Sequence, residues 1–585
     1  MVKALVAALE ERVQKALVAA LGAPAEGADS LIRPSDHADF QSNAVLPLAK
    51  SLKANPRELA VQVAEALTGD DLIATCVVAG PGFLNLTIAD AAIAGQIAAR
   101  LGDSRLGVPA GGLGSVAVID YSQPNIAKEM HVGHLRSTVI GDALVRVLEF
   151  TGTKVIRQNH LGDWGTQFGM LIQFLVEHAE LRDHADTESG SEAISRLNAL
   201  YRDSRAKFDS DPEFAERARG RVVALQAGDE QTLAGWREIV AESKVYFEEV
   251  YSRLQVLLVD EDAVGESFYN LSLSDVAVDL EQRGVAVRSN GALCVFFDDV
   301  TGPDGAPVPL IVQKSDGGFG YAATDLAAIR YRVQTLGADQ ILYVVDSRQA
   351  LHFKMVFDTA RRAGYLPDTV QAVHVAFGSV LGTDGKPFKT RAGSTVRLIS
   401  LLDEAVEHAR ATVGEKNPDL AADVLTARAQ ELGIGAVKYA DLSTSRTRDY
   451  VFDLDRMVSL TGNTSVYLQY AHARICSILR RLPAGASEAI VHIDVEMAPA
   501  ERKLAMLLDD FGATTRAVVE NFEPHRLCSY LYAVAQAFSD FYESCPVLKA
   551  PSDVVRDNRV VLCRLTSETF KLGLDLLGIA APEKL

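Results

Sequence analysis

The middle of the chain alternates between short β-branched runs and amphipathic helical stretches. The run "VAVIDYS" from residue 116 predicts a strand, "HVGHLRSTVIGDALVRVLEFTG" a helix that stops at glycine, and "KVIRQNHL" a second strand. Further along, "QILYVVD" and "AVHVAFGSVLG" predict strands on either side of the helix "ALHFKMVFDTARRAG". Strand, helix, strand is the pattern of parallel βαβ units. We therefore predict an α/β doubly wound, Rossmann-like domain over residues 111–400.

The pattern changes in three other places, and each change predicts a further part of the fold. Between the βαβ units, a charged helical stretch over about 170–260 leads into a mixed region to 310, as in a sheet with insertions. Residues 1–110 combine an Ala/Leu-rich helix with the strand-like "VVAGPGFLNLTI", which predicts a small α+β domain that ends in the Gly-rich linker 107–115. Residues 401–585 are helical almost throughout, which predicts an all-α C-terminal bundle.

Length and cysteine usage narrow the class of protein. A chain of 585 residues exceeds the size at which single cores stop growing, so several domains are expected. Charges interrupt every long apolar stretch, so we expect neither a signal peptide nor a membrane span, and a cytoplasmic protein. The six cysteines are scattered without CxxC spacing, which argues against structural zinc and against a disulfide framework.

The net charge bears on the choice of partner. The chain has 58 Lys and Arg against 77 Asp and Glu, a balance of −19 that disfavours a nucleic-acid partner. A sum over the whole chain does not exclude a local basic surface, so binding to RNA stays open.

The stretch "SQPNIAKEMHVGHLRST" places two histidines where a first strand passes into a helix. A metal site would need further ligands at suitable spacing, and none accompany His131 and His134. In an open α/β sheet this place faces the ligand, and the free N–H groups of a helix N-terminus suit phosphate. Lys128 adds a cation, and Gly133 permits close approach by a ligand. The pattern favours a phosphate site, in which the imidazoles donate hydrogen bonds, over two solvated histidines.

Several segments in the same order carry a resemblance to a known family. "HVGH" is similar to the HIGH signature of class I aminoacyl-tRNA synthetases, and its surroundings with "NHLGDWGTQFGML" resemble the bacterial-type arginyl-tRNA synthetases. The likeness continues through "YAATDLAAIRYR", "DSRQALHFK", "GKPFKTRAGSTV", "LTGNTSVYLQYAHAR" and "KLGLDLLGI". It implies a two-step reaction. Arginine and ATP give arginyl-adenylate and pyrophosphate, and the arginyl group then passes to the terminal adenosine of tRNA(Arg).

The resemblance assigns the ATP site to the helix start and to a second basic segment. It implies that His131 and His134 are catalytic and contact ATP together with Gly133, and that Mg²⁺ accompanies the nucleotide. The second class signature, KMSKS, is degenerate here as "GKPFKTRAGST". The implied ATP-binding and catalytic residues of that segment are Lys386, Phe388, Lys389 and Arg391. Lys128 is implied to replace the missing lysine, so which cation touches phosphate stays open, with a solvated basic turn as the alternative for 385–395.

Recognition of arginine can be argued from the guanidinium group, which is planar and offers five donors. A selective site needs carboxylates for bidentate pairing and an aromatic ring nearby. Tyr321 and Asp325 share one face if "YAATD" is helical, and Asp120 ends the first strand. By resemblance these three hold the guanidinium, while Asn125 and Gln349 hold the α-amino and carboxylate groups. A helix-terminal charge that only adds stability is the alternative for Asp325.

Two segments are implied to bind tRNA. The loop "DFQSN" at 39–43 is similar to the elbow-reading surface of the family's N-terminal domain, where side chains stack on or hydrogen-bond an unpaired base. The contacts implied there are Phe40, Gln41 and Asn43. The anticodon contacts implied in the helical domain are Asn463, Tyr467 and Arg474. Core positions of an amphipathic helix are the alternative for Tyr467, Tyr470 and His472.

Other functions are weighed against this one. A cysteinyl synthetase would need zinc cysteines, and a non-catalytic RNA-binding relative would have lost the histidines and the "FKTRAG" segment, which are present. A regulator that binds free arginine would give no pyrophosphate exchange. We expect a monomer with no membrane partner, in which adenylate formation waits for tRNA.

Overall fold

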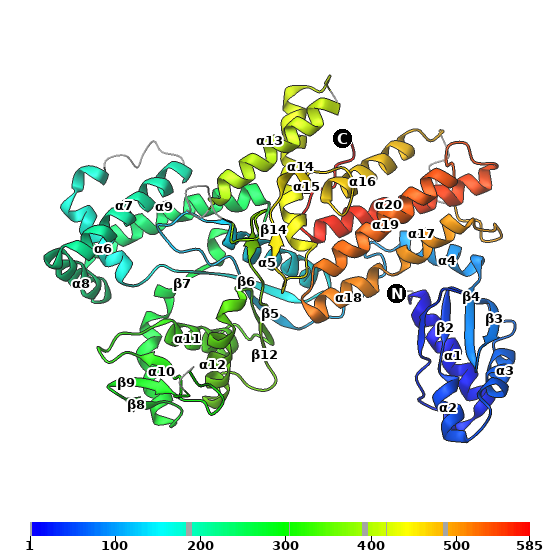
Figure 1. Ribbon diagram of the computed structural model, residues 1–585, viewed down its shortest axis with the longest axis horizontal. Coiled ribbons are helices and arrows are strands. Elements are labelled where there is room, and N and C mark those ends of the chain that lie inside the picture. The colour runs from blue at the N-terminus through cyan, green and yellow to red at the C-terminus, as the bar shows by residue number, and fades with distance from the viewer. Residues whose placement is uncertain (1–2, 183–189, 303–304, 389–395, 417, 484–489) are drawn as a thin grey trace.

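The computed structural model describes residues 3–182, 190–302, 305–388, 396–416, 418–483 and 490–585. Figure 1 shows an elongated molecule, with the N-terminal domain (blue) at one end of the long axis and a helical insertion (α6 to α9) at the other. The central sheet lies between them, and the helices of the C-terminal bundle run from the middle of the molecule toward the end that holds the N-terminal domain. No helix in these described ranges is long and apolar enough to span a membrane.

The N-terminal domain packs three helices against a four-stranded antiparallel sheet of order β1-β2-β4-β3. Its elements are α1 (Leu5–Leu21), η1 (Ala23–Ala25), β1 (Ile32–Pro34), β2 (Phe40–Ser42), α2 (Val45–Leu52), α3 (Pro56–Ala66), β3 (Ile73–Ala79) and β4 (Phe83–Ile88). The expectation that 39–43 form a loop was wrong for residues 40–42. This segment is a strand because Phe40 and Ser42 both point into the core, and β1 and β4 pair with it on either side.

The central domain contains a five-stranded parallel sheet of order β12-β11-β5-β6-β7, which confirms the doubly wound, Rossmann-like class. The strands are β5 (Val116–Asp120), β6 (Lys154–Leu161), β7 (Ala263–Gly265), β11 (Gln340–Tyr343) and β12 (Gln371–His374). The helices of the two βαβ units are α5 (Val132–Phe150) and α12 (Ala350–Arg362). Three other helices precede parts of these units, namely α4 (Asp90–Leu101) before β5, α11 (Tyr321–Gln334) before β11, and η5 (Ser347–Gln349) before α12.

Two insertions interrupt this sheet, as the change of pattern predicted. The first is the helical group α6 (Thr166–Glu177), η2 (Ala179–Arg182), α7 (Gly190–Ser210), α8 (Pro212–Gln226) and α9 (Glu230–Leu254). The second joins η3 (Asp260–Asp262), η4 (Glu266–Tyr269) and α10 (Asn270–Gln282) to a small antiparallel sheet of β8 (Val287–Ser289), β9 (Ala292–Val295) and β10 (Leu310–Gln313).

The C-terminal part is the expected helical bundle, with one short β-ladder before it. Its elements are β13 (Val380–Leu381), α13 (Leu398–Lys416), α14 (Ala422–Leu442), β14 (Tyr450–Val451), α15 (Leu454–Met457), α16 (Ser465–Arg480), α17 (Pro499–Asp509), α18 (Phe511–Asn521), α19 (His525–Ser544) and α20 (Asp553–Leu576). The strand expected from residue 372 to 382 is broken. It pairs in the central sheet only to His374, and Val380–Leu381 pairs with β14 instead.

Buried charges join the N-terminal part to the C-terminal bundle. Arg100 of α4 donates through Nε to Asp509 of α17 at 2.8 Å, and both side chains are buried. The same carboxylate accepts from the backbone N–H of Leu5 and from Gln96. A few residues along α17, Arg502 pairs with both Asp39 and Asp90. The N-terminal part of the chain and the C-terminal bundle therefore meet in a charged, hydrogen-bonded junction.

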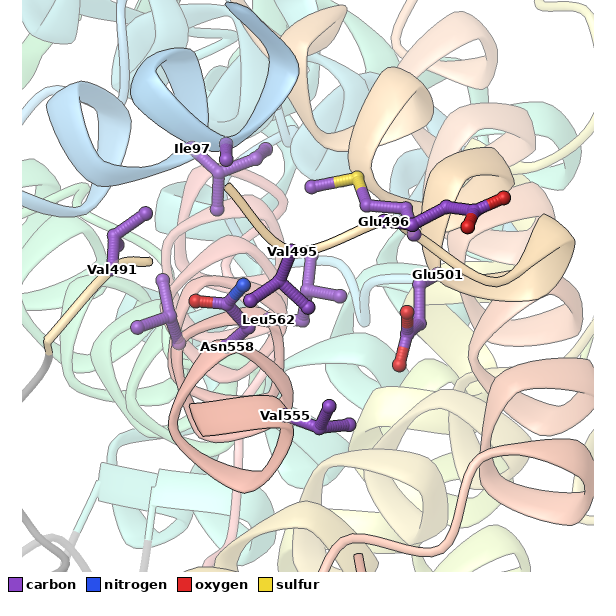
Figure 2. A pocket seen from close by; sticks show the side chains of 11 residues that line it. Ile97, Val491, Val495, Glu496, Glu501, Val555, Asn558 and Leu562 are labelled. Atoms are coloured by element: carbon purple, nitrogen blue, oxygen red, sulfur yellow. The ribbon is translucent and has the colours of Figure 1, made fainter. Parts of the chain in front are cut away.

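An apolar crevice lies at the same junction, between α4, the segment before α17, and α20. Figure 2 shows Ile97, Val495 and Leu562 around it, with Glu501 at one side. The Glu501 carboxylate is paired with Arg559, so it offers no free charge. A volume of about 20 Å³ leaves room for about one water molecule, which is too small for a substrate.

Candidate active site

The site lies at the carboxyl ends of the central strands, where the order of the sheet reverses. From β5 the chain passes through α5 to β6 on one side, and β11 pairs with the other side of β5. Ligands of open α/β sheets bind at such a switch point. A cavity of about 210 Å³ opens there. It is lined by Asp120, Gln123, Asn125, His160, Gly162, Glu266, Tyr321, Thr324, Asp325, Tyr343, Gln349, His352 and Phe353. All five residues that the sequence predicted for arginine binding thus lie around one cavity.

The two histidines of the "HVGH" segment cap the helix that follows β5. The Nδ1 atom of His131 accepts from the backbone N–H of Gly133 at 3.0 Å, and Nδ1 of His134 accepts from the N–H of His131 at 3.0 Å. Because each Nδ1 is an acceptor, the proton of each neutral ring sits on Nε2, which is left to donate. A Cβ on Gly133 would lie only 2.8 Å from the His131 ring, so this close capping arrangement requires glycine.

Both imidazoles are neutral at pH 7. Burial lowers the pKa of His134 to about 3, with the neighbouring His131 and Lys128 as smaller causes. Burial also lowers the pKa of His131. The start of α5 therefore offers two uncharged N–H donors together with its own backbone N–H groups and its positive dipole end.

The loop between β5 and α5 is held in an unusual backbone conformation. Ser122, Gln123 and Ala127 have φ of 75°, 54° and 61°, in the left-handed region that side chains with a Cβ rarely adopt. A side-chain oxygen accepts each of their backbone N–H groups. The acceptors are Ser137, Asn159 and Ser243, from α5, β6 and α9. The loop is thus fixed from three elements before any ligand binds.

Asp120 lies on the cavity wall with its charge already compensated. Its Oδ2 accepts from Nη2 of Arg332 at 2.6 Å, and both side chains are buried. Its Oδ1 accepts from Gln123 at 2.7 Å. The structure therefore places Asp120 in the cavity, but as one half of a buried ion pair.

Two other carboxylates face the cavity without a strong cation of their own. Asp325, the fifth residue of α11, lies 2.6 Å from Nε2 of His352. In the described part of the chain no side chain forms an ion pair with Glu266. Burial, with the nearby Asp163 and Asp325 as smaller causes, raises the pKa of Glu266 to about 8. Carboxylates gathered in this way provide a site for a cation.

The second signature segment is described only in part. Lys386 is exposed on a turn after β13, and Phe388 packs its ring on Phe452, with 5.0 Å between centroids. Lys389 and Arg391 lie outside the described residues. Beyond them the chain returns to the "HVGH" helix, where the N–H of Leu398 donates to Met130 at 2.9 Å.

In the described ranges, no group of three or more His, Cys, Asp or Glu is arranged to hold a metal ion. The six cysteines are free, and none is bonded to another.

Comparison with known proteins gives the family. The model described as "tRNA synthetases class I (R), catalytic domain" matches residues 97–454. The arginine–tRNA ligase of Frankia casuarinae is 60% identical over 564 residues, which cover 96% of this chain and 95% of that protein. The chain belongs to the arginyl-tRNA synthetase family. Its activity is that of an arginine–tRNA ligase.

Other matches cover the rest of this arginyl-tRNA synthetase. The "Arginyl tRNA synthetase N terminal domain" matches residues 7–88 and the "DALR anticodon binding domain" residues 468–585. The arginine–tRNA ligase of Streptomyces avermitilis is 57% identical over the whole of both chains. The crystal structure of the Plasmodium falciparum arginyl-tRNA synthetase superposes with a TM-score of 0.82 at 28% identity, covering 100% of this chain and 99% of that one.

In the N-terminal domain of this synthetase, the predicted tRNA residues divide between core and surface. Phe40 is 7% exposed and belongs to the core, so its ring is not available for stacking on a base in this structure. Gln41 and Asn43 lie at the surface of the sheet. Gln41 donates to Asn85 at 2.8 Å, and Asn43, with its amide oriented to suit its neighbours, donates to Gln41 and accepts from Arg33.

In the C-terminal bundle of the synthetase, the predicted residues also differ in exposure. Tyr467 is half-buried against Tyr532, and exposed Asn463 accepts from the Tyr439 hydroxyl at 2.7 Å. Arg474 lies between the exposed rings of Tyr470 and Tyr542, 5.0 and 5.2 Å from their centroids. His472 is buried, which agrees with the alternative that this residue is a core position of the helix.

Sequence reasoning missed several residues of the cavity. These are Glu266, which comes from a segment that carries no motif of its own, His160, and Gln123, which follows directly after the predicted first strand. His160 lies in the quoted "NHLGDWG", so that motif could have suggested it. Only the folded chain brings Glu266 to the cavity, from the second insertion.

Proposed function

We propose that the adenylate forms where the arginine cavity meets the start of α5. In this proposal, Nε2–H of His131 and of His134 donate to phosphate oxygens of ATP. Neutral donors fixed by their Nδ1 bonds support this role, because they stabilise charge developing at the α-phosphate without first losing a proton. Gly133 would leave room for the nucleotide, and Lys128 would supply the cation that the degenerate second signature lacks.

The substrate arginine would enter the cavity with its guanidinium toward Asp325, Glu266 and Tyr321. The observation that carries this proposal is that one cavity of suitable size holds an aromatic residue and two carboxyl groups for which the described residues supply no Lys or Arg partner. A guanidinium satisfies carboxylates through paired N–H donors. Asn125 and Gln349 would hold the α-amino and carboxylate groups. Because Arg332 already neutralises Asp120, we assign Asp120 to shaping the cavity wall rather than to direct charge recognition.

Mg²⁺ would arrive with ATP. Since no group of three or more His, Cys, Asp or Glu among the described residues is arranged to hold a metal ion, the phosphates and water would supply most of its oxygen ligands. From the second signature, Lys386, Phe388, Lys389 and Arg391 remain proposed contacts of ATP.

The tRNA would bind across the N-terminal domain and the C-terminal bundle. Gln41 and Asn43 would read the elbow, with Phe40 fixing their strand from the core side. Arg474, with Asn463 and Tyr467 nearby, would contact the anticodon region. We expect the enzyme to act as a cytoplasmic monomer, which light scattering of the protein with and without tRNA would test.

Pyrophosphate exchange into ATP tests the reaction as a whole. We expect exchange with arginine alone among the twenty amino acids, and only when tRNA is present. Exchange with arginine in the absence of tRNA would remove the tRNA requirement. Absence of exchange under every condition would contradict the assignment of the catalytic residues.

A further inference from the structure

One helix of the first insertion lies directly against the residues that precede the "HVGH" segment. The ammonium nitrogen of Lys128 lies 4.7 Å from the centroid of the Tyr201 ring of α7. In the part of the chain that the structure describes, Lys128 forms no ion pair and no hydrogen bond through that nitrogen. Its ammonium is therefore held by an aromatic face and by no carboxylate.

The next residue along the chain explains why no carboxylate neutralises Lys128. Glu129 is engaged on both oxygens. Oε1 accepts from Ser195 at 2.7 Å and Oε2 from Asn198 at 3.1 Å. Oε2 also lies 3.0 Å from Nε of Arg397, which follows the second signature segment. The nearest acidic side chain in the sequence is thus already engaged by Ser195, Asn198 and Arg397.

The contacts come from one side of α7. Ser195, Asn198 and Tyr201 are spaced three residues apart, so they follow one ridge of the helix. Two of them fix Glu129 and the third meets Lys128. A different lysine on the same helix shows the contrast, because Lys207 packs on the Phe214 ring and also pairs with Glu177 at 2.7 Å.

We propose that Tyr201 is a positioning residue for Lys128 in adenylate formation. A lysine side chain has many rotamers, and an aromatic face restricts them while leaving the full positive charge available to phosphate. A carboxylate partner would instead compete with the phosphates for the ammonium. The bonds of Glu129 to Ser195 and Asn198 keep α7 in the register that presents the ring. This inference rests on the proposed contact of Lys128 with ATP.

The test compares variants of Tyr201 in pyrophosphate exchange with arginine and tRNA saturating and ATP varied. Tyr201→Leu should lower kcat/KM for ATP about three- to tenfold, the range expected for an exposed to partly desolvated cation–π contact. The KM for arginine should stay unchanged. Tyr201→Phe keeps the ring and should retain activity within about twofold. Phe208→Leu is the matched control, since Phe208 lies on α7 with Arg205 over its ring but away from the site.

A double variant separates positioning from a general structural effect. In a Lys128→Met background, Tyr201→Leu should have no further effect, because the two residues act through one contact. Additive losses, or a parallel rise in the KM for arginine, would overturn the proposal. Unchanged exchange in Tyr201→Leu, with Lys128→Met strongly impaired, would also overturn it while leaving the function of Lys128 intact. Normal exchange in Lys128→Met would instead contradict the proposed role of Lys128 itself. Tyr201→Met serves in the same comparison if the leucine variant unfolds.

Discussion

Asp120 and Arg332 form an ion pair in the wall of the cavity proposed to bind arginine. Oδ2 of Asp120 lies 2.6 Å from Nη2 of Arg332, and both side chains are buried. The carboxylate expected to recognise the substrate guanidinium thus already has a guanidinium partner within the protein. A cavity with a neutralised Asp120 must rely on other carboxylates for charge recognition. This assigns different outcomes to substitutions of the two aspartates that the sequence had grouped together.

Asp325→Asn should raise the KM for arginine about 10- to 100-fold, as expected for loss of a charged hydrogen bond, and leave the KM for ATP nearly unchanged. Asp120→Asn should instead leave Arg332 buried without its partner and destabilise the fold by about 3–5 kcal/mol. Steady-state exchange and thermal unfolding of both variants check the contrast. A larger arginine effect in Asp120→Asn than in Asp325→Asn would contradict it.

Glu266 should make arginine binding depend on pH. Its pKa of about 8 in the empty cavity means that the carboxyl group is mostly protonated at pH 7, and binding of a cation must ionise it. The affinity for arginine should therefore rise about fivefold between pH 7 and pH 8 and level off above that. Calorimetry in buffers of different ionisation enthalpy would detect the released proton. Glu266→Gln should weaken binding and abolish the pH dependence, and a persistent pH dependence would exclude Glu266 as its source.

The raised pKa of Glu266 also makes the stability of the folded protein depend on pH. A carboxyl group that prefers its proton in the folded state contributes stability fully at a pH below its unfolded pKa. That contribution is lost as the pH rises toward 8. Saturating arginine should offset the loss, since it binds the folded state with Glu266 ionised.

His134→Ala should lower the rate of adenylate formation about 100-fold while the affinity for arginine is kept. His134→Asn is the informative partner, because an asparagine can still cap the N–H of His131 and should retain more stability than alanine. With its pKa at about 3, His134 should give no acid limb in the pH–rate profile between pH 5.5 and 8. An acid limb near pH 6.5 that disappears in His134→Asn would show that this histidine is protonated during the reaction.

The cluster of Arg474 with Tyr470 and Tyr542 should act in tRNA binding. Tyr542→Ala should raise the Kd for tRNA roughly 5- to 100-fold if a base stacks there. Arg474→Ala should reduce the salt dependence of binding by about one unit of slope. Filter binding over a range of salt concentrations measures both. Tyr467→Phe removes only the half-buried hydroxyl that contacts Ser539 and keeps the ring, so it measures what that hydroxyl adds to this proposed contact. If all three variants bind tRNA with the Kd of the unaltered protein, the anticodon binds elsewhere.

Local sequence patterns predicted the sheet and the position of the two histidines at the start of a helix, because both depend on neighbours in the chain. The βαβ periodicity and the strand-to-helix position of His131 are of this kind. Glu266 could not be found in this way, since it reaches the cavity from the second insertion, in a segment that carries none of the quoted motifs. The neutralisation of Asp120 by Arg332, 212 positions away, likewise exists only in the folded chain.

Burial accounts for the remaining differences between the roles predicted for residues and their places in the structure. Phe40 fits a stacking role by residue type, yet the alternation of β2 turns it into the core, and the pattern of five residues is too short to settle which side faces water. Exposure likewise separates Tyr470 from His472, two positions apart on α16.

The bond from Arg100 to Asp509 also affects how this chain is made. At an elongation rate of about 5–20 residues per second, the ribosome needs roughly 20–80 seconds to add the intervening residues, a sequence separation of 409. During that time the guanidinium of Arg100 and the N–H of Leu5 have no bundle to bind. The nascent N-terminal domain must therefore keep its docking face open during that time, and its final placement can begin only after Asp509 has been made. Ribosomes that stall before residue 509 would leave that face exposed to chaperones.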